Sequence, residues 1–146
     1  MKLTSKGRYA VMAMADLAKN RVKEPTSLTE ISLRQGISIA YLEQLFIRLR
    51  KNKLVQSTRG PLGGYVLIKK PEKIKLISII DAVDEKIKTV KCIKESKKSC
   101  NGKSIKCITH NLWDDLEAHI NKFFESNTLK DILFKEVRNN VEELKQ

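Results

Sequence analysis

The stretch "ISIAYLEQLFIRLRKNKL", residues 37–54, decides the fold of this 146-residue chain. Ser38 is of a type that caps helix N-termini. Four apolar residues then follow at the i, i+3, i+4, i+7 spacing of one helix face, namely Leu42, Leu45, Phe46 and Leu49. The opposite face carries Ala40, Glu43, Gln44, Ile47 and Arg48. The pattern predicts an amphipathic helix with one buried face and one exposed, mostly polar face.

Two further helices are predicted upstream. Apolar residues at helical spacing indicate a helix over residues 5–20, which Thr4 or Ser5 could cap. Ser27 and Glu30 have the spacing of a capping box, and Gly36 suits the end of the short helix that follows. A short helix, a glycine turn and an amphipathic helix are typical of a helix-turn-helix.

In a helix-turn-helix, the first turns of the second helix meet base edges in the major groove. Gln44 can form two hydrogen bonds with adenine, and Glu43 can accept one from a cytosine amino group. The alternative is a generic three-helix unit with a solvated polar face. The charge distribution favours DNA binding: residues 1–75 carry 16 basic and 5 acidic side chains, against 13 and 12 in residues 76–146.

A hairpin follows the third helix. Residues 54–58 and 65–68 are short β-prone runs separated by "RGPLGG". We interpret the glycines as turn residues and the hairpin as a wing with Arg59 at its tip, followed by Gly60. An arginine on a thin loop can enter a narrow minor groove. The expected fold is therefore mainly α-helical, a winged helix-turn-helix with a small β-hairpin.

The second half predicts a connector helix, a cysteine-bearing loop and a long helix. "LISIIDAVDE" indicates a short amphipathic helix through Ile77, Ile80 and Val83. A second apolar stripe consists of Leu112, Trp113, Leu116, Ile120, Phe123 and Phe124. On so small a chain we expect this stripe to form a homodimer interface, although an intramolecular role is the alternative. We divide the chain into a DNA-binding domain, residues 1–75, and a second part, residues 76–146, with a candidate ligand loop at 92–110.

All three cysteines lie in that loop, with a histidine close behind the last: Cys92, Cys100, Cys107 and His110. No apolar stretch is long enough to span a membrane, and no secretion signal is evident, so we expect a cytoplasmic protein with reduced thiols. Zinc sites usually begin with cysteines two to four residues apart, unlike the seven- and six-residue gaps here. From the spacing alone, a zinc site and an iron–sulfur cluster are about equally well supported.

Five segments in order, "LTSKGRYAV", "ISLRQGIS", "YLEQLFIRLRKN", "RGPLGGY" and "AVDE", resemble the IscR-like family of winged-helix bacterial transcription factors. The resemblance implies a homodimer that binds a [2Fe–2S] cluster and a double-stranded operator, and that mainly represses cluster-assembly genes. By position it implies cluster ligands at Cys92, Cys100, Cys107 and His110. With the helix face and wing above, the predicted DNA contacts are Ala40, Glu43, Gln44, Arg48, Arg59 and Gly60.

The chain departs from the better-known members of that family in three places. Ala40 stands where they have serine, Leu62 replaces a wing glycine, and the gaps between the cysteines are longer. Three alternatives remain: a regulator on the same scaffold that senses nitric oxide, redox state or a protein partner; a zinc-binding structural module; and a thiol enzyme using Cys107 with His110. We expect a regulator with no small-molecule substrate, not an enzyme, because no oxyanion hole or orienting group is evident.

Overall fold

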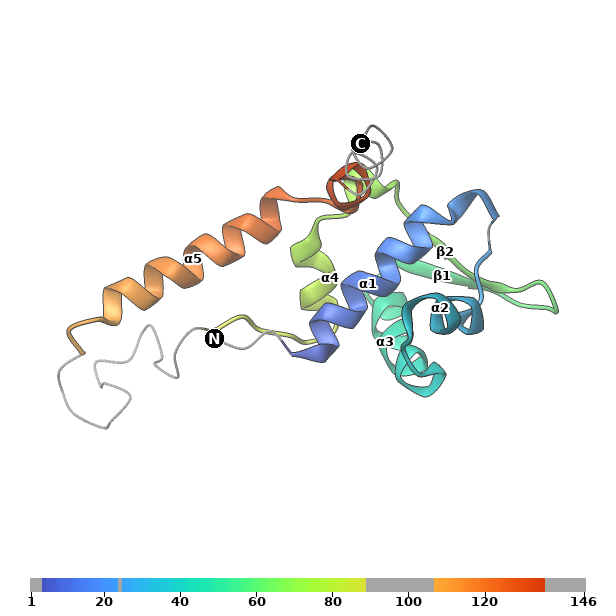
Figure 1. Cartoon of the computed structure of the whole chain (residues 1–146), viewed down its shortest axis with the longest axis horizontal. Coiled ribbons are helices and arrows are strands. Elements are labelled where there is room, and N and C mark those ends of the chain that lie inside the picture. Colours follow the sequence, from blue (N-terminus) through green and yellow to red (C-terminus); the bar gives the residue numbers. More distant parts are fainter. Residues whose placement is uncertain (1–3, 24, 89–106, 136–146) are drawn as a thin grey trace, which may run out of the picture.

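A computed structural model describes residues 4–23, 25–88 and 107–135 of the chain. The order of elements is α1 (Ser5–Lys19), η1 (Arg21–Lys23), α2 (Leu28–Gln35), α3 (Ile39–Lys51), β1 (Val55–Thr58), β2 (Gly64–Leu67), η2 (Pro71–Lys73), α4 (Leu76–Ala82) and α5 (His110–Ser126). Residues 129–135 are helical as well. The fold is mainly α-helical with one antiparallel hairpin, as the sequence predicts (Figure 1).

The predicted caps of the helix-turn-helix are present. The Ser27 hydroxyl accepts from the Glu30 backbone N–H at 3.2 Å, and the Glu30 carboxylate accepts from the Ser27 N–H at 2.8 Å. Gly36 ends α2 with φ +67°, a conformation that costs glycine little. The Ser38 hydroxyl accepts from the Tyr41 N–H at 3.2 Å. These contacts fix where α2 ends and where α3 begins.

One hydrophobic core joins α1, α2, α3 and α4. The four apolar residues of the α3 stripe are buried, as predicted, and pack with α1 residues such as Met14 and Leu17. The core also contains Leu129, which follows α5 in the chain. The N–H of Leu129 donates to the carbonyl of Ile74 at 3.1 Å, so the end of α5 is tied back to the start of α4.

The hairpin pairs Val55 with Leu67 and Thr58 with Gly64. Each strand lies within a residue of its predicted run. Beside it, the N–H of Tyr65 donates to the carbonyl of Thr26 at 2.7 Å. A Cβ on Gly64 would lie 2.3 Å from that same oxygen, so this close approach of two backbones requires glycine.

Two local expectations differ from the structure. Thr4 occupies the N-cap position of α1, but its hydroxyl makes no cap hydrogen bond. The carboxylate of Glu85, far along the chain, instead accepts from the N–H groups of Thr4 and Gly7. In α4, the spacing predicts Ile77 on the buried face, but it is only half-buried, whereas Ile79 is fully buried. The core packs against a slightly different side of this helix than the spacing indicates.

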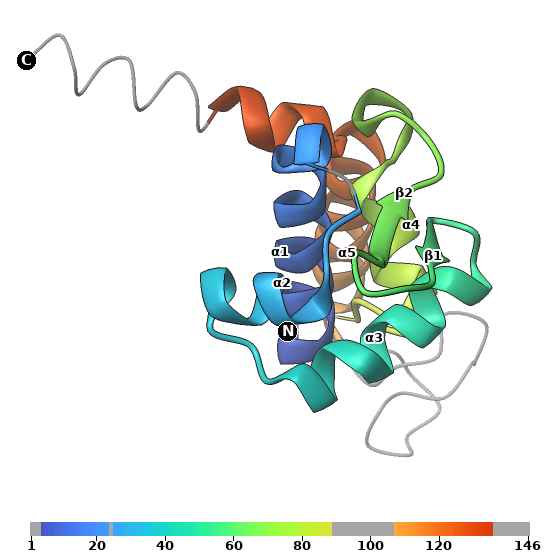
Figure 2. The ribbon, with the colours of Figure 1, turned by 90° about the vertical axis from the view of Figure 1, so that its right-hand side faces the viewer.

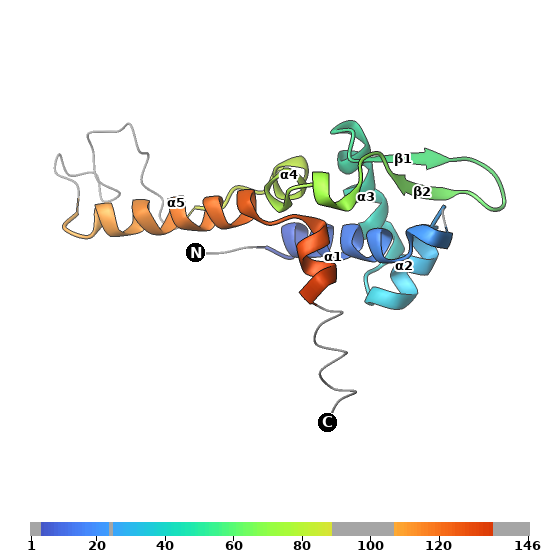
Figure 3. The same ribbon diagram turned by 90° about the horizontal axis from the view of Figure 1, so that it is seen from above.

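Helix α5 extends away from the body formed by α1–α4 and the hairpin, in the direction opposite to the hairpin (Figures 1 and 3). Figure 2 shows the molecule from the hairpin end, with α5 lying behind the body. Over the described ranges, no helix is long and apolar enough to cross a membrane.

Candidate DNA-binding and ligand site

The exposed face of α3 carries the predicted base-reading residues. Ala40, Glu43 and Gln44 are all exposed, while the opposite face of the helix is buried in the core. The core thus fixes which face of α3 is available for contact with a partner. The placement agrees with a recognition helix, and the contact of each residue with DNA remains a prediction.

The wing follows α3 directly. The N–H of Leu54 donates to the carbonyl of Leu49 at 3.1 Å, which joins β1 to the end of α3. Arg59 is exposed in the turn, and Gly60 has φ +116°. A Cβ on Gly63 would lie 2.2 Å from the carbonyl oxygen of Thr58, so the turn is closed tightly by backbone atoms. Because Thr58 pairs with Gly64, Arg59 is the first residue of the loop 59–63 and not, as the sequence predicts, its tip, and its side chain is exposed.

Arg48 lies one turn beyond Gln44 and has partners within the protein. Its Nη1 donates to Asp84 Oδ2 at 2.7 Å and to the carbonyl oxygen of Val83 at 3.3 Å. Sequence reasoning missed Asp84. The segment "AVDE" gave no sign of this contact, because Arg48 and Asp84 are 36 positions apart.

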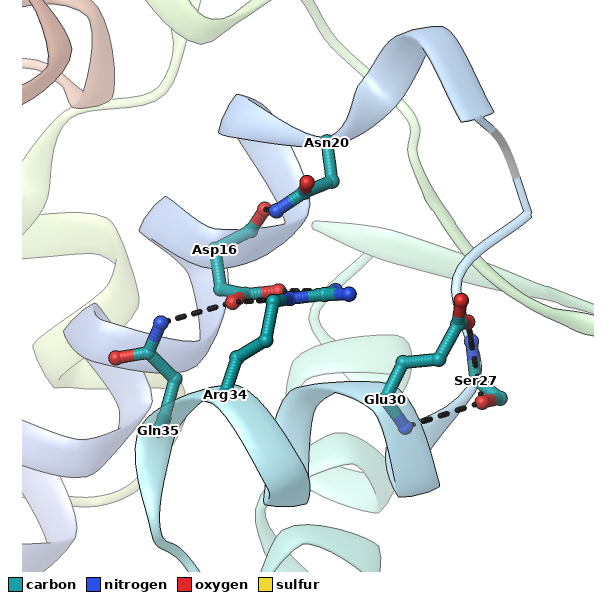
Figure 4. A network of polar contacts seen from close by, with 6 residues as sticks. All are labelled: Asp16, Asn20, Ser27, Glu30, Arg34 and Gln35. Carbon is teal, nitrogen blue, oxygen red and sulfur yellow. Dashed lines mark hydrogen bonds and ion pairs between the residues drawn. The ribbon is translucent and has the colours of Figure 1, made fainter.

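A buried carboxylate joins α2 to α1. Asp16 of α1 accepts from Nε and Nη2 of Arg34, at 2.9 and 2.8 Å, and from Nε2 of Gln35 at 2.8 Å (Figure 4). The hydrogen bonds to Asp16 raise the pKa of Arg34 further. This network fixes the first helix of the helix-turn-helix against the core.

Glu85 holds the start of α1. Its burial raises the pKa of the carboxyl, but the hydrogen bonds from Thr4 and Gly7 outweigh burial and leave the pKa below its ordinary value. A carboxylate at a helix N-terminus is also favoured by the helix dipole. The residues just after α4 thus contact two helices of the DNA-binding half, Asp84 touching α3 and Glu85 touching α1.

Two of the four predicted ligands are described. Cys107 is an exposed free thiol just before α5, and His110 is the buried first residue of α5. The N–H of His110 donates to the carbonyl of Cys107 at 3.0 Å, so one turn brings the two residues together. His110 Nε2 lies 3.3 Å from Asp114 Oδ2. Cys92 and Cys100 lie outside the described residues, within which no three potential metal ligands converge.

The predicted interface stripe lies on α5. Leu112, Leu116 and Phe123 are exposed, whereas Trp113, Ile120 and Phe124 are half-buried. An exposed row of large apolar side chains on a projecting helix is unfavourable in water, and its role in association remains a prediction.

Comparison with known proteins agrees with this geometry. The family model Rrf2, described as an iron-dependent transcriptional regulator, matches residues 3–135. The chain is 49% identical to the HTH-type transcriptional regulator IscR of Sodalis glossinidius, over 93% of this chain and 81% of that protein. It is 50% identical to the protein of the same name from Serratia proteamaculans, over 91% and 79%.

Solved structures of similar fold are also regulators. T. potens IscR has a TM-score of 0.74 and 36% identity, covering 93% of this chain and 88% of that one. CymR, the global cysteine regulator of B. subtilis, has a TM-score of 0.76 and 33% identity, over 90% and 95%. The chain therefore belongs to the Rrf2 family, and it is a DNA-binding transcriptional regulator of the IscR type rather than an enzyme.

Proposed function

We propose that the chain is a cytoplasmic homodimer that senses iron–sulfur cluster status through a [2Fe–2S] cluster and, mainly as a repressor, controls genes of cluster biogenesis. The observation that carries this proposal is the set Cys92, Cys100, Cys107 and His110, between the DNA-binding half and α5, in a chain about half identical to proteins named IscR. In this proposal residues 1–75 bind DNA, and residues 76–146 sense the cluster and form the dimer.

The donor set fits an iron–sulfur cluster. Three thiolates and one imidazole supply the four protein ligands of a [2Fe–2S] unit, and two histidines in place of two cysteines raise the potential in Rieske centres. The described pair supports this assignment, because Cys107 is an exposed thiol and its backbone carbonyl accepts from the N–H of His110, three residues on. When bound, the cluster would supply a redox- and iron-responsive group.

The DNA contacts follow from what α3 and the wing expose. Gln44 and Glu43, both exposed, would read bases, with Ala40 beside them at the start of the helix. Arg59 and Gly60 form the wing contact, and Arg48 contacts the backbone of the duplex. Two such reading heads in one dimer would match an operator with two half-sites.

The dimer would form through α5. Its three exposed stripe residues, Leu112, Leu116 and Phe123, would pack against the same residues of a second copy, whereas Phe124 packs against the core of its own chain. Because α5 begins at His110, the segment that carries the proposed ligands would lead directly into the proposed dimer helix.

The test is the absorption spectrum of protein purified without oxygen, with iron and sulfide counts. We expect a reddish-brown protein with two iron and two sulfide per chain, as the [2Fe–2S] formula requires. The colour is lost in Cys107→Ser and kept in Ile108→Ser, which changes the neighbouring exposed residue. A colourless protein with stoichiometric zinc would identify the zinc site instead and contradict the proposal.

A further inference from the structure

The last turn of α3 is fastened to the end of α4 by polar contacts. Besides the bonds of Arg48 to Asp84 and Val83, Nδ2 of Asn52 lies 3.3 Å from the carbonyl oxygen of Ala82 and donates to the carbonyl of Arg48 at 2.8 Å. The last carbonyls of a helix are left without partners in the helix, and here side chains from α3 and its C-cap donate to those of Ala82 and Val83. Arg48 therefore belongs both to the exposed face of α3 and to this joint.

Asp84 has a backbone conformation that glycine usually supplies. Its φ is +57°, and it stands just past the end of α4, where its N–H donates to the carbonyl of Asp81 at 3.0 Å and the next N–H, of Glu85, donates to that of Ile80 at 3.2 Å. This is the position where helices commonly end on glycine. A side chain here adds nothing to the turn itself. What the aspartate adds is a carboxylate against Arg48.

The Arg48–Asp84 pair can exchange with a competing anion. The Arg48 side chain is 43% exposed and that of Asp84 is 77% exposed. Exposed pairs contribute only about 0–1 kcal/mol. A DNA phosphate is a strong acceptor for a guanidinium, so it can displace the carboxylate. Once displaced, the exposed carboxylate would still repel the duplex. Asp84 would thus oppose DNA binding in two ways, by competing for Arg48 and by charge repulsion.

We propose that Asp84 is a positioning residue that limits DNA affinity by holding the Arg48 guanidinium against the end of α4, in competition with a DNA phosphate. This inference rests on the proposed placement of α3 on DNA. Because a phosphate contact is independent of base sequence, Asp84 sets the affinity for all duplexes and leaves base preference to residues nearer the start of α3.

The test compares full-length, anaerobically purified variants by fluorescence anisotropy on a labelled duplex of mixed sequence, over a range of salt concentrations. Asp84→Asn removes the charge and keeps a residue that tolerates positive φ. Asp81→Asn, one turn earlier at an exposed position of α4, is the matched control for loss of one negative charge. Arg48→Gln and the double variant complete the cycle, and thermal melting checks that every variant is folded.

We expect Asp84→Asn to bind about three- to fivefold more tightly, the range that release of an exposed pair allows. Its plot of log affinity against log salt should be steeper by at most about 0.9, the slope of one complete phosphate contact, because Asp84 leaves that contact partly formed in wild type. Asp81→Asn should change affinity less and leave the slope as in wild type. In the Arg48→Gln background, the effect of Asp84→Asn on the slope should vanish.

Three results would overturn the inference: unchanged or weaker binding by Asp84→Asn, an equal gain from Asp81→Asn, or a steeper slope that persists without Arg48. In each of these cases, binding of the duplex by the wild-type protein would still agree with the proposed function. Wild-type protein that binds no duplex even at low salt would contradict the proposed function itself, and the inference with it.

Discussion

Arg34 of α2 donates two parallel hydrogen bonds to Asp16 of α1, Nε to Oδ2 at 2.9 Å and Nη2 to Oδ1 at 2.8 Å. The Asp16 side chain is 1% exposed and that of Arg34 is 37% exposed. The buried carboxylate on α1 therefore holds α2 in place through a guanidinium that is still partly exposed to water. Since α2 supports the turn that leads into α3, this contact positions α3, the proposed recognition helix.

Asp16→Asn should lower the free energy of unfolding by about 2–3 kcal/mol, because the amide has no charge and its NH2 group replaces one of the two oxygens that accept from Arg34 and Gln35. Urea unfolding measures the loss. Asp115→Asn, at an exposed position of α5, is the control and should change stability little. A loss for Asp16→Asn as small as that of the control would show that the network does not stabilise the fold.

Glu85 should make stability depend on pH. Its pKa in the folded protein lies below the ordinary value of 4.5, so the carboxylate stabilises the folded state fully above that value. The contribution is lost as pH falls through the folded-state pKa. Wild type should exceed Glu85→Gln by about 2 kcal/mol in unfolding free energy near neutral pH, the range for hydrogen bonds to a charged group.

Urea unfolding of both proteins from neutral to acid pH checks this prediction. The difference between wild type and Glu85→Gln should be constant above pH 4.5, the ordinary value for this carboxyl, and shrink below it. Glu125→Gln, on an exposed part of α5, serves as control. A difference that is the same at every pH would mean that the carboxylate charge is not what holds the start of α1.

The α5 stripe should control association. Leu116 is 38% exposed in the single chain and lies on the apolar face, so Leu116→Glu places a charge in the proposed interface. Ala118→Glu places the same charge at an exposed position on the other side of α5. Light scattering after size-exclusion chromatography should give a monomer for the first and a dimer for the second. If both variants are dimers, the stripe is not part of the interface.

Two variants should distinguish residues that read bases from residues that contact the DNA backbone. Gln44→Ala should relax specificity at one base pair by about 1–3 kcal/mol, because a bidentate contact with adenine is lost. Arg59→Ala should weaken binding to every duplex and reduce the salt slope by about 0.9 if its contact is to phosphate. Anisotropy with duplexes altered one base pair at a time distinguishes them. If neither variant changes affinity or specificity, α3 and the wing do not contact DNA as proposed.

Local patterns in the sequence predicted most of the DNA-binding half. The capping box of Ser27 with Glu30, the glycine at position 36 and the stripe from Leu42 to Leu49 each depend on residues a few positions apart, and each is present in the structure. The exposed face of α3 follows from the buried stripe, so the placement of Glu43 and Gln44 could be predicted as well.

Contacts between distant residues could not be predicted in this way. Glu85 caps α1 from 81 positions beyond Thr4, and Asp84 pairs with Arg48 from 36 positions away. No periodicity records such pairs, because they depend on how α4 packs against α1 and α3. The same reason explains the error at Thr4, whose hydroxyl is of a capping type but donates to Glu85 instead.

The most direct test of the central claim compares the DNA affinity of one preparation with and without its cluster. The duplex is selected in vitro by the wild-type protein, and anisotropy is measured without oxygen before and after removal of iron. We predict that the two forms differ in affinity for this duplex, and that Cys107→Ser behaves like the cluster-free form throughout. Equal affinity of the two forms would contradict a regulator whose DNA binding depends on its cluster.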